Sequence, residues 1–330
     1  MSENTKIEWC DHTWSPWEGC QKVGPGCDHC YAEVRNARFA GGTAVNWGAG
    51  APRRRTAPDS WKLPLRWDRK ARDLGKRLRI FPSLCDPFDN AVDPAWRRDL
   101  FELIARTPNL DWLLLTKRIG NARDMLNEVV DELSRGLNTW DELPWPTIWL
   151  GATIVNQAEA DRDIEKLLMT PARRRFLSME PLLGPVNLRA WFDPTGVCCM
   201  REMQSCEDCP ADAPWIHGPT TQYAEDGTGF SSPEIDWVIV GGESGYRARP
   251  MHPEWARDLR DQCTAYGLPF LFKQWGEWAD HDQPGVDMLG TVHSPLHKWP
   301  DGKHSVRLGK RAAGRLLDGR THDEIPRGVQ

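Results

Sequence analysis

The chain has 330 residues, of which 40% are hydrophobic and 27% charged, a composition typical of a globular protein and not of a disordered one. The formal net charge of −5 excludes a protein whose whole surface binds nucleic acid, but it is compatible with a local basic groove. We expect no transmembrane helix, since no window approaches 18 continuous apolar residues, and no export, since residues 1–14 are polar.

Six short apolar runs recur along the chain, and stretches of helical length follow them. The runs are residues 78–84, 112–116, 147–153, 175–179, 235–240 and 269–272. Runs that are apolar on both faces are typical of buried parallel strands. Helix signals begin at Asp93-Pro94, at Asn156 and at His252-Pro253. The alternation predicts an α/β fold with a parallel sheet, which we take to be a partial (β/α)6 TIM-type barrel; a doubly wound sheet is the alternative.

The ten cysteines include two groups with the same spacing, C-x6-C-x2-C. The first group is Cys20, Cys27 and Cys30. Without an export signal, these cysteines are not expected to form disulfides. A C-x2-C pair brings two thiolates within reach of one metal, and thiolates favour zinc or iron–sulfur clusters over hard cations. The first group therefore predicts a metal centre, and the candidates for a fourth ligand are Cys10, His12 and His29.

The second group is Cys199, Cys206 and Cys209, with Cys198 beside it and His217 as a further candidate ligand. It lies in a polar segment, residues 193–232, that is rich in Gly, Pro, Asp, Glu and Thr and is typical of an insertion on a surface loop. We expect a small structural zinc site there. A second iron–sulfur cluster and unliganded surface cysteines are the alternatives.

Polar residues follow each apolar run, and the carboxyl ends of strands carry the site in barrels and open α/β sheets. We therefore expect one end of the sheet to gather two lysines, two carboxylates and a glycine-rich turn, residues 241–245 (GGESG). The catalytic candidates are Lys117, Glu180 and Lys273. The turn is neither G-x-G-x-x-G nor a P-loop, so nicotinamide and P-loop nucleotide sites have little support.

Two stretches of the chain are basic. Residues 53–79 contain eleven Lys or Arg against three Asp, with Trp61 and Trp67 between them, and residues 303–320 add six more basic residues. Cations attract a phosphate backbone, and aromatic faces can stack on bases. The two stretches modestly favour a nucleic acid or nucleotide as substrate; solvated surface charge is the alternative.

Long strings along most of the chain resemble a phage-encoded family of unknown function with a three-cysteine motif, which lies near the radical SAM enzymes. They are IEW at 7–9, GCQKVGPGCDHCYAE at 19–33, LTKR at 115–118, SMEPLLGP at 178–185, GGESG and ARP within 241–250, FKQWGEW at 272–278 and GRLLDGR at 314–320. Radical SAM enzymes typically have the spacing C-x3-C-x2-C, and the first spacer here is three residues longer.

The resemblance implies a [4Fe–4S] cluster on Cys20, Cys27 and Cys30 with one open iron, to which S-adenosylmethionine (SAM) binds. It also implies a SAM site at the strand ends. Glu243 and Glu180 would accept hydrogen bonds from the SAM amine, and Lys117 and Asn156 would donate to its carboxylate. The remaining cofactor-binding candidates are the backbone of Gly241 and Gly242, which a ligand can approach closely, and Ser244.

Two function classes follow. The first is a radical SAM-type enzyme that modifies a nucleobase or nucleotide in DNA or RNA, with an electron donor as partner, in the cytoplasm of an infected bacterial host. The second is a zinc-stabilised nucleic-acid-binding protein without catalysis. We expect a barrel domain at residues 1–280, with the insertion at 193–232, and a basic C-terminal extension at 281–330.

Overall fold

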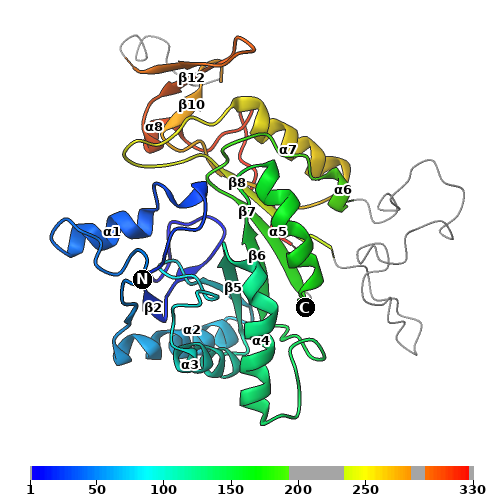
Figure 1. Ribbon diagram of the computed structural model, residues 1–330. Coiled ribbons are helices and arrows are strands. Elements are labelled where there is room, and N and C mark those ends of the chain that lie inside the picture. Colours follow the sequence, from blue (N-terminus) through cyan, green and yellow to red (C-terminus); the bar gives the residue numbers. More distant parts are fainter. Residues whose placement is uncertain (1, 193–233, 284–293, 327–330) are drawn as a thin grey trace, which may run out of the picture.

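The structure, a computed structural model, describes residues 2–192, 234–283 and 294–326 (Figure 1). The second cysteine group and the rest of the expected insertion at 193–232 lie outside these residues. Within them, no helix is both long and apolar enough to cross a membrane.

Seven strands form one sheet in which every neighbouring pair is parallel. In spatial order they are β1 (His12–Thr13), β4 (Leu78–Phe81), β5 (Leu110–Thr116), β6 (Ile148–Thr153), β7 (Arg174–Met179), β8 (Trp237–Gly241) and β9 (Phe270–Gln274). The sheet curls into a half-barrel that helices flank (Figure 1). The six apolar runs are confirmed as β4 to β9. β1 was not predicted, because two residues in a polar N-terminal segment carry no apolar pattern.

The helices include the three that the sequence predicts. They are α1 (Tyr31–Phe39), α2 (Lys62–Asp73), α3 (Pro94–Ala105), α4 (Ile119–Ser134), α5 (Gln157–Met169), α6 (Arg189–Phe192), α7 (Pro253–Ala265) and α8 (Lys310–Ala313). Asp93 caps α3 by accepting a hydrogen bond from the Ala95 amide at 2.9 Å. α5 and α7 are capped in the same way by Asn156 and His252.

Alternate residues along the strands enter two apolar clusters, one on each face of the sheet. In β5, Trp112 and Leu114 pack with residues of the flanking helices, whereas Leu113 packs on the other face with large aromatic rings. Those rings belong to Trp9, Phe81, Trp149, Phe176 and Trp237. Eight of the 18 tryptophans are among the largest fully buried side chains, so the unusual tryptophan content serves core packing.

A small antiparallel sheet joins the two domains that the sequence predicts. β10 (Trp278–Asp280) pairs with β12 (His304–Arg307), which also pairs with β11 (Leu296–Lys298), so the expected boundary at residue 280 falls between paired strands. Farther along, the Phe272 amide of β9 donates to the His322 carbonyl at 3.0 Å. The Trp275 amide likewise donates to the Gly314 carbonyl at 3.1 Å, so the segment that contains the basic C-terminal stretch packs against the end of β9. The remaining strands of the described residues, β2 (Trp17–Glu18) and β3 (Arg54–Arg55), pair with each other in antiparallel fashion.

Gly151 in β6 makes room for an aromatic ring. A Cβ atom at this position would lie 2.3 Å from Cζ of Phe176 on the adjacent strand. We expect Gly151→Ala to lower the free energy of unfolding by about 1–3 kcal/mol, because the ring must move within a packed core. Gly120→Ala in α4 is the control, since its Cβ would meet only the Lys166 side chain at 3.6 Å and alanine favours a helix. Urea unfolding of both variants checks this, and equal stabilities would contradict it.

Candidate functional site

Residues 20–30, which we call the cysteine loop, lie across the carboxyl ends of the strands. At its beginning, Gln21 accepts a hydrogen bond from Arg118, which follows β5. In its middle, a Cβ on Gly26 would lie 2.7 Å from Val155, just after β6. Near its end, His29 Nδ1 donates to the Glu243 carboxylate, just after β8, at 2.9 Å. The loop therefore spans the mouth of the half-barrel from β5 to β8.

The loop carries the three predicted metal ligands, but their side chains do not converge. Cys20 and Cys30 pack against the same small apolar cluster of Ala32, Trp47 and Leu84. Cys27 ends a 3-10 turn, Pro25–Cys27, and Cys30 is the N-cap residue of α1. Among the residues that the structure describes, no three His, Cys, Asp or Glu side chains are gathered as a metal site. The donor set is that of a soft metal or a cluster, and the three thiols share one loop.

The three predicted candidates for a fourth ligand have other partners. Cys10 is buried in the apolar cluster around Trp9, and burial raises the pKa of its thiol to about 12. His12 lies in β1, stacks on Trp67 with ring centroids 4.4 Å apart, and accepts a hydrogen bond from the Asn4 amide. His29 is bonded to Glu243. Of these, only His29 belongs to the cysteine loop.

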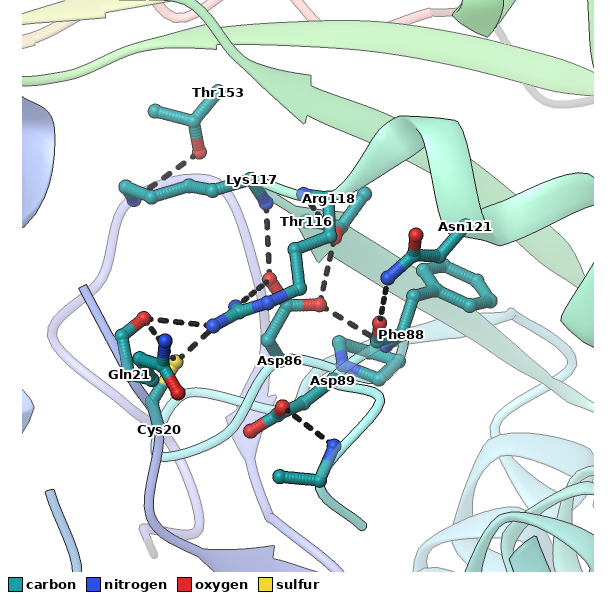
Figure 2. Close-up of polar contacts among 12 residues, drawn as sticks. Cys20, Gln21, Asp86, Phe88, Asp89, Thr116, Lys117, Arg118, Asn121 and Thr153 are labelled. Atoms are coloured by element: carbon teal, nitrogen blue, oxygen red, sulfur yellow. Dashed lines mark hydrogen bonds and ion pairs between the residues drawn. The ribbon is translucent and has the colours of Figure 1, made fainter. Parts of the chain in front are cut away.

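A buried carboxylate, Asp86, organises the segments that follow β4 and β5, and Arg118 links it to the first cysteine (Figure 2). It accepts hydrogen bonds from the Thr116 hydroxyl at 2.6 Å, the Lys117 amide at 3.0 Å and Arg118 Nη1 at 3.1 Å. Arg118 Nη1 also lies 3.4 Å from Cys20 Sγ. Burial and the Asp86 charge raise the pKa of the Cys20 thiol to about 11, while Arg118 acts in the opposite direction. The network thus places a buried cation directly against the Cys20 sulfur.

Lys117, one of the catalytic candidates, lies beneath the cysteine loop. Its Nζ donates to the Thr153 hydroxyl at the end of β6, at 3.3 Å (Figure 2). A Cβ on Gly26 of the loop would lie 3.5 Å from Lys117 Cε. The lysine is therefore held between two strand ends and the loop that carries the cysteines.

The structure brings three other predicted residues together at the ends of β7, β8 and β9. Lys273 Nζ contacts both oxygens of Glu180, at 2.9 and 2.6 Å. Gln274 Nε2 donates to Glu180 Oε1 and to the Ser244 hydroxyl, each at 3.0 Å. The side chains of Glu180 and Lys273 are 18% and 15% exposed, so this ion pair is shielded but still open to the mouth.

The first two glycines of the turn, Gly241 and Gly242, have protein atoms, and not open space, beside them. A Cβ on Gly242 would lie 1.9 Å from the Trp275 carbonyl oxygen, and one on Gly241 would lie 3.2 Å from Cδ of Glu180. The β8–β9 register also shifts at this point, between Val240 and Gly241. Gly242 is therefore required by the close approach of two backbone segments, which gives it a packing role.

Glu243 ties the cysteine loop to the end of β8. Its carboxylate accepts hydrogen bonds from His29 and from the backbone amide, Nε and Nη2 of Arg249. Arg249 in turn contacts Asp28 and donates to the Pro25 carbonyl. Burial alone would raise the pKa of Glu243, but the bonds from Arg249 and His29 outweigh it and lower that pKa. We call this set of contacts the Arg249 tether.

Asn156, the remaining predicted cofactor ligand, caps α5: its Oδ1 accepts from the Glu159 amide at 3.0 Å. The sequence analysis did not choose Asp86, Arg118, Thr153 or Gln274 as site residues, although each ends or follows a predicted strand and that position was the available signal. Arg249 follows β8 by several residues, so no pattern identified it. Its role depends on the path of the cysteine loop.

The first basic stretch, residues 53–79, is largely neutralised. Nine of its eleven cations form ion pairs, namely Arg53, Arg54, Arg55, Lys62, Arg66, Lys70, Arg72, Arg77 and Arg79. Most of their partners lie elsewhere in the chain, as in the buried pair of Arg53 with Asp89. Trp67 is buried and Trp61 packs against the core. This stretch therefore offers few free charges or aromatic faces to a nucleic acid.

Arg249→Ala tests the tether. The variant removes the side-chain donors that hold Asp28 and the Pro25 carbonyl, so amides of residues 24–30 should exchange with solvent about tenfold faster or more. Arg38→Ala is the control, because Arg38 is an exposed cation of α1 whose side chain makes no hydrogen bond or ion pair with residues 24–30 in the described chain. Hydrogen-exchange mass spectrometry measures both. Equal protection in the wild type and Arg249→Ala would contradict the tether.

Comparison with known proteins gives one match. Residues 4–326 match the family described as a protein of unknown function, DUF5131. No curated protein matches the chain, and no solved structure does. Because the match covers nearly the whole length, the chain belongs to the DUF5131 family.

Proposed function

We propose that this protein is a radical SAM-type iron–sulfur enzyme that modifies a nucleobase or nucleotide, built on a partial (β/α)6 barrel of the TIM type. One observation carries the proposal: a loop with three cysteines follows the first parallel strand and lies across the carboxyl ends of the others. In α/β barrels that edge is where catalytic residues gather. Six of the seven parallel strands, β4 to β9, correspond to the six predicted βα units, and helices flank the sheet, which supports this part of the proposal.

In this proposal Cys20, Cys27 and Cys30 hold a [4Fe–4S] cluster, with thiolate donors suited to iron. When bound, such a cluster supplies the electron for reductive cleavage of SAM to a carbon radical. The Arg118 guanidinium, 3.4 Å from Cys20 Sγ, stabilises the thiolate form of that cysteine against the opposing effect of burial. The Arg249 tether keeps the other end of the loop over the mouth. An external electron donor is a required partner.

SAM carries an ammonium and a carboxylate, so its pocket needs an acceptor and a donor. Glu243 already accepts four hydrogen bonds, and we therefore assign amine recognition to Glu180, which is partly exposed. Lys117, whose Nζ donates to the Thr153 hydroxyl and pairs with no carboxylate in the described chain, is the cation we assign to the SAM carboxylate, because Lys273 is already paired with Glu180. Glu243 then affects SAM binding indirectly, because it helps to hold the cysteine loop in position. Asn156 also acts indirectly, because it caps the N-terminus of α5.

The metal assignment is tested by replacing cysteines. Anaerobically reconstituted wild-type protein should be brown and contain iron and sulfide in a ratio near one. Alanine at Cys20, Cys27 or Cys30 should strip the iron, because each thiolate is a ligand. Cys263→Ala is the control, since that buried cysteine lies in α7. Full iron content in the triple variant would overturn the assignment, and a colourless zinc protein would support the non-catalytic alternative.

Glu180→Gln tests the SAM site. Removing the carboxylate charge should weaken SAM binding to the iron-loaded protein about tenfold, or about 1.4 kcal/mol, because an ion pair is lost in a shielded cleft. Isothermal titration calorimetry measures the affinity. Glu254→Gln, which alters an ion pair with Arg257 on α7, should bind SAM as the wild type does. Unchanged affinity in Glu180→Gln would remove Glu180 from the site.

A further inference from the structure

The turn that follows Glu243 exposes an aromatic side chain, that of Tyr246, to solvent. Tyr246 is 80% exposed, and the Arg247 guanidinium lies over its ring, 5.3 Å from the centroid. The turn is fastened on both sides of the ring: the Gly245 amide donates to Glu277 Oε1 at 3.0 Å, and Trp278 Nε1 donates to the Ala248 carbonyl at 2.7 Å. Because its ring is exposed, Tyr246 buries little apolar surface when the chain folds. The fixed turn nevertheless holds the ring in position, so it is preorganised for contact with another molecule.

Three further cations adjoin this turn. Arg307 Nη2, on β12, lies 3.4 Å from the Gly245 carbonyl. Lys310 and Arg311 are exposed and begin α8. Gly309, which precedes them, lies near the turn: a Cβ on Gly309 would lie 3.8 Å from Glu277 Oε2, while Oε1 of the same carboxylate accepts from the Gly245 amide. Figure 1 shows α8 together with β10 and β12 at one end of the molecule.

These cations differ from those of the first basic stretch in having no carboxylate partner. Within the described part of the chain, none of Arg247, Arg307, Lys310 and Arg311 forms an ion pair, whereas nine of eleven cations in residues 53–79 do. Unpaired cations keep their full attraction for an external anion. The positive charge near Tyr246 is therefore free to attract an anion, whereas that of residues 53–79 is largely neutralised.

The surface also borders the candidate site. The turn that presents Tyr246 begins at Glu243 and ends at Arg249, the two residues that fasten the cysteine loop. A polymer bound along the cations would therefore pass beside the mouth of the half-barrel. Tyr246 precedes Arg249 by three residues, so a base stacked on Tyr246 would lie near the Arg249 tether.

We propose that Tyr246, Arg247, Arg307, Lys310 and Arg311, the Tyr246 face, bind a single-stranded nucleic acid. The cations neutralise backbone phosphates, and the tyrosine ring stacks on an unpaired base. A duplex hides the faces of its bases, so the exposed ring favours a single strand. As a substrate site this face rests on the function proposed above, whereas strand binding itself requires no metal.

The test is the affinity of the full-length protein for fluorescein-labelled 20-nucleotide strands, measured by fluorescence anisotropy as a function of salt. Tyr246→Ala should weaken binding about tenfold, because one stacked base is lost. The double variant Lys310→Ala/Arg311→Ala should reduce the slope of log K against log salt by about 1.4, since each phosphate contact on a single strand contributes about 0.7. DNA and RNA strands of the same sequence distinguish the two kinds of nucleic acid.

Arg69→Ala/Lys76→Ala is the matched control. Both residues are exposed, belong to the first basic stretch and have no ion pair within the described chain, so the variant removes the same charge from another surface. It should bind the strand as the wild type does. An equal loss in both double variants would show attraction to net charge only and overturn the proposal. Duplex binding as tight as strand binding, or binding of an acidic peptide that Tyr246→Ala leaves unchanged, would also overturn it.

The outcome is separable from that of the proposed function. Iron content and SAM affinity should be the same in Tyr246→Ala and in the wild type, because this ring touches neither the cysteines nor Glu180. Normal iron and SAM binding with no strand binding would overturn the Tyr246 face alone. Strand binding by a protein that holds no iron would leave the face intact and remove the radical SAM proposal.

Discussion

The common direction of the seven strands is the constraint on which the candidate site depends. Because every pair in the sheet is parallel, the residues that follow each strand meet at one edge. Asp86, Lys117, Thr153, Glu180 and Glu243 lie tens of residues apart in the sequence and reach that edge for this reason alone. The curl of the sheet then turns the edge into the rim of a half-barrel, which an eleven-residue loop can cross (Figure 1).

Two buried carboxylates fix the cysteine loop at its ends. Asp86 holds Arg118 against Cys20 and Gln21, and Glu243 holds Arg249 against Pro25 and Asp28. A buried charge is costly unless it is paired and hydrogen-bonded, and both carboxylates have several donors. Removing one partner would leave the other charge uncompensated. The loop is thus fastened by interactions that are individually expensive to break, and none of its three cysteines is in a disulfide.

Local patterns in the sequence predicted the elements of the sheet well, because burial on both faces and helix capping are local signals. β4 to β9 and the cap of α3 by Asp93 follow directly from them. β1 has only two residues and exists through its pairing with β4, which a local pattern does not reveal. Contacts between distant segments were also beyond prediction. The close approach of the Trp275 carbonyl to Gly242 is one such contact, and the approach of a ligand to this glycine stays a prediction.

The same limit applies to charge. How much of a segment's charge is free depends on which carboxylates lie near it in the fold, and a local sequence pattern does not reveal these neighbours. Residues 53–79 have the denser run of cations, yet carboxylates such as Asp89, Asp99 and Asp111 neutralise much of it. Residues 303–320 have fewer cations, but four of them, Arg307, Lys310, Arg311 and Arg320, form no ion pair in the described structure, and Arg307 contacts the turn that carries the exposed Tyr246. The number of Lys and Arg residues alone would favour residues 53–79 over residues 303–320 as an anion-binding surface, which is the opposite of what the ion pairs indicate.

Electron paramagnetic resonance of the reduced, iron-loaded protein, recorded with and without SAM, tests the proposed iron–sulfur site. Three thiolates would leave one iron of a [4Fe–4S] cluster open, so the cluster signal should change when SAM is added. The signal should be absent from the variant in which Cys20, Cys27 and Cys30 are all replaced by alanine. A protein that forms no cluster, or a cluster signal that SAM leaves unchanged, would contradict the radical SAM proposal.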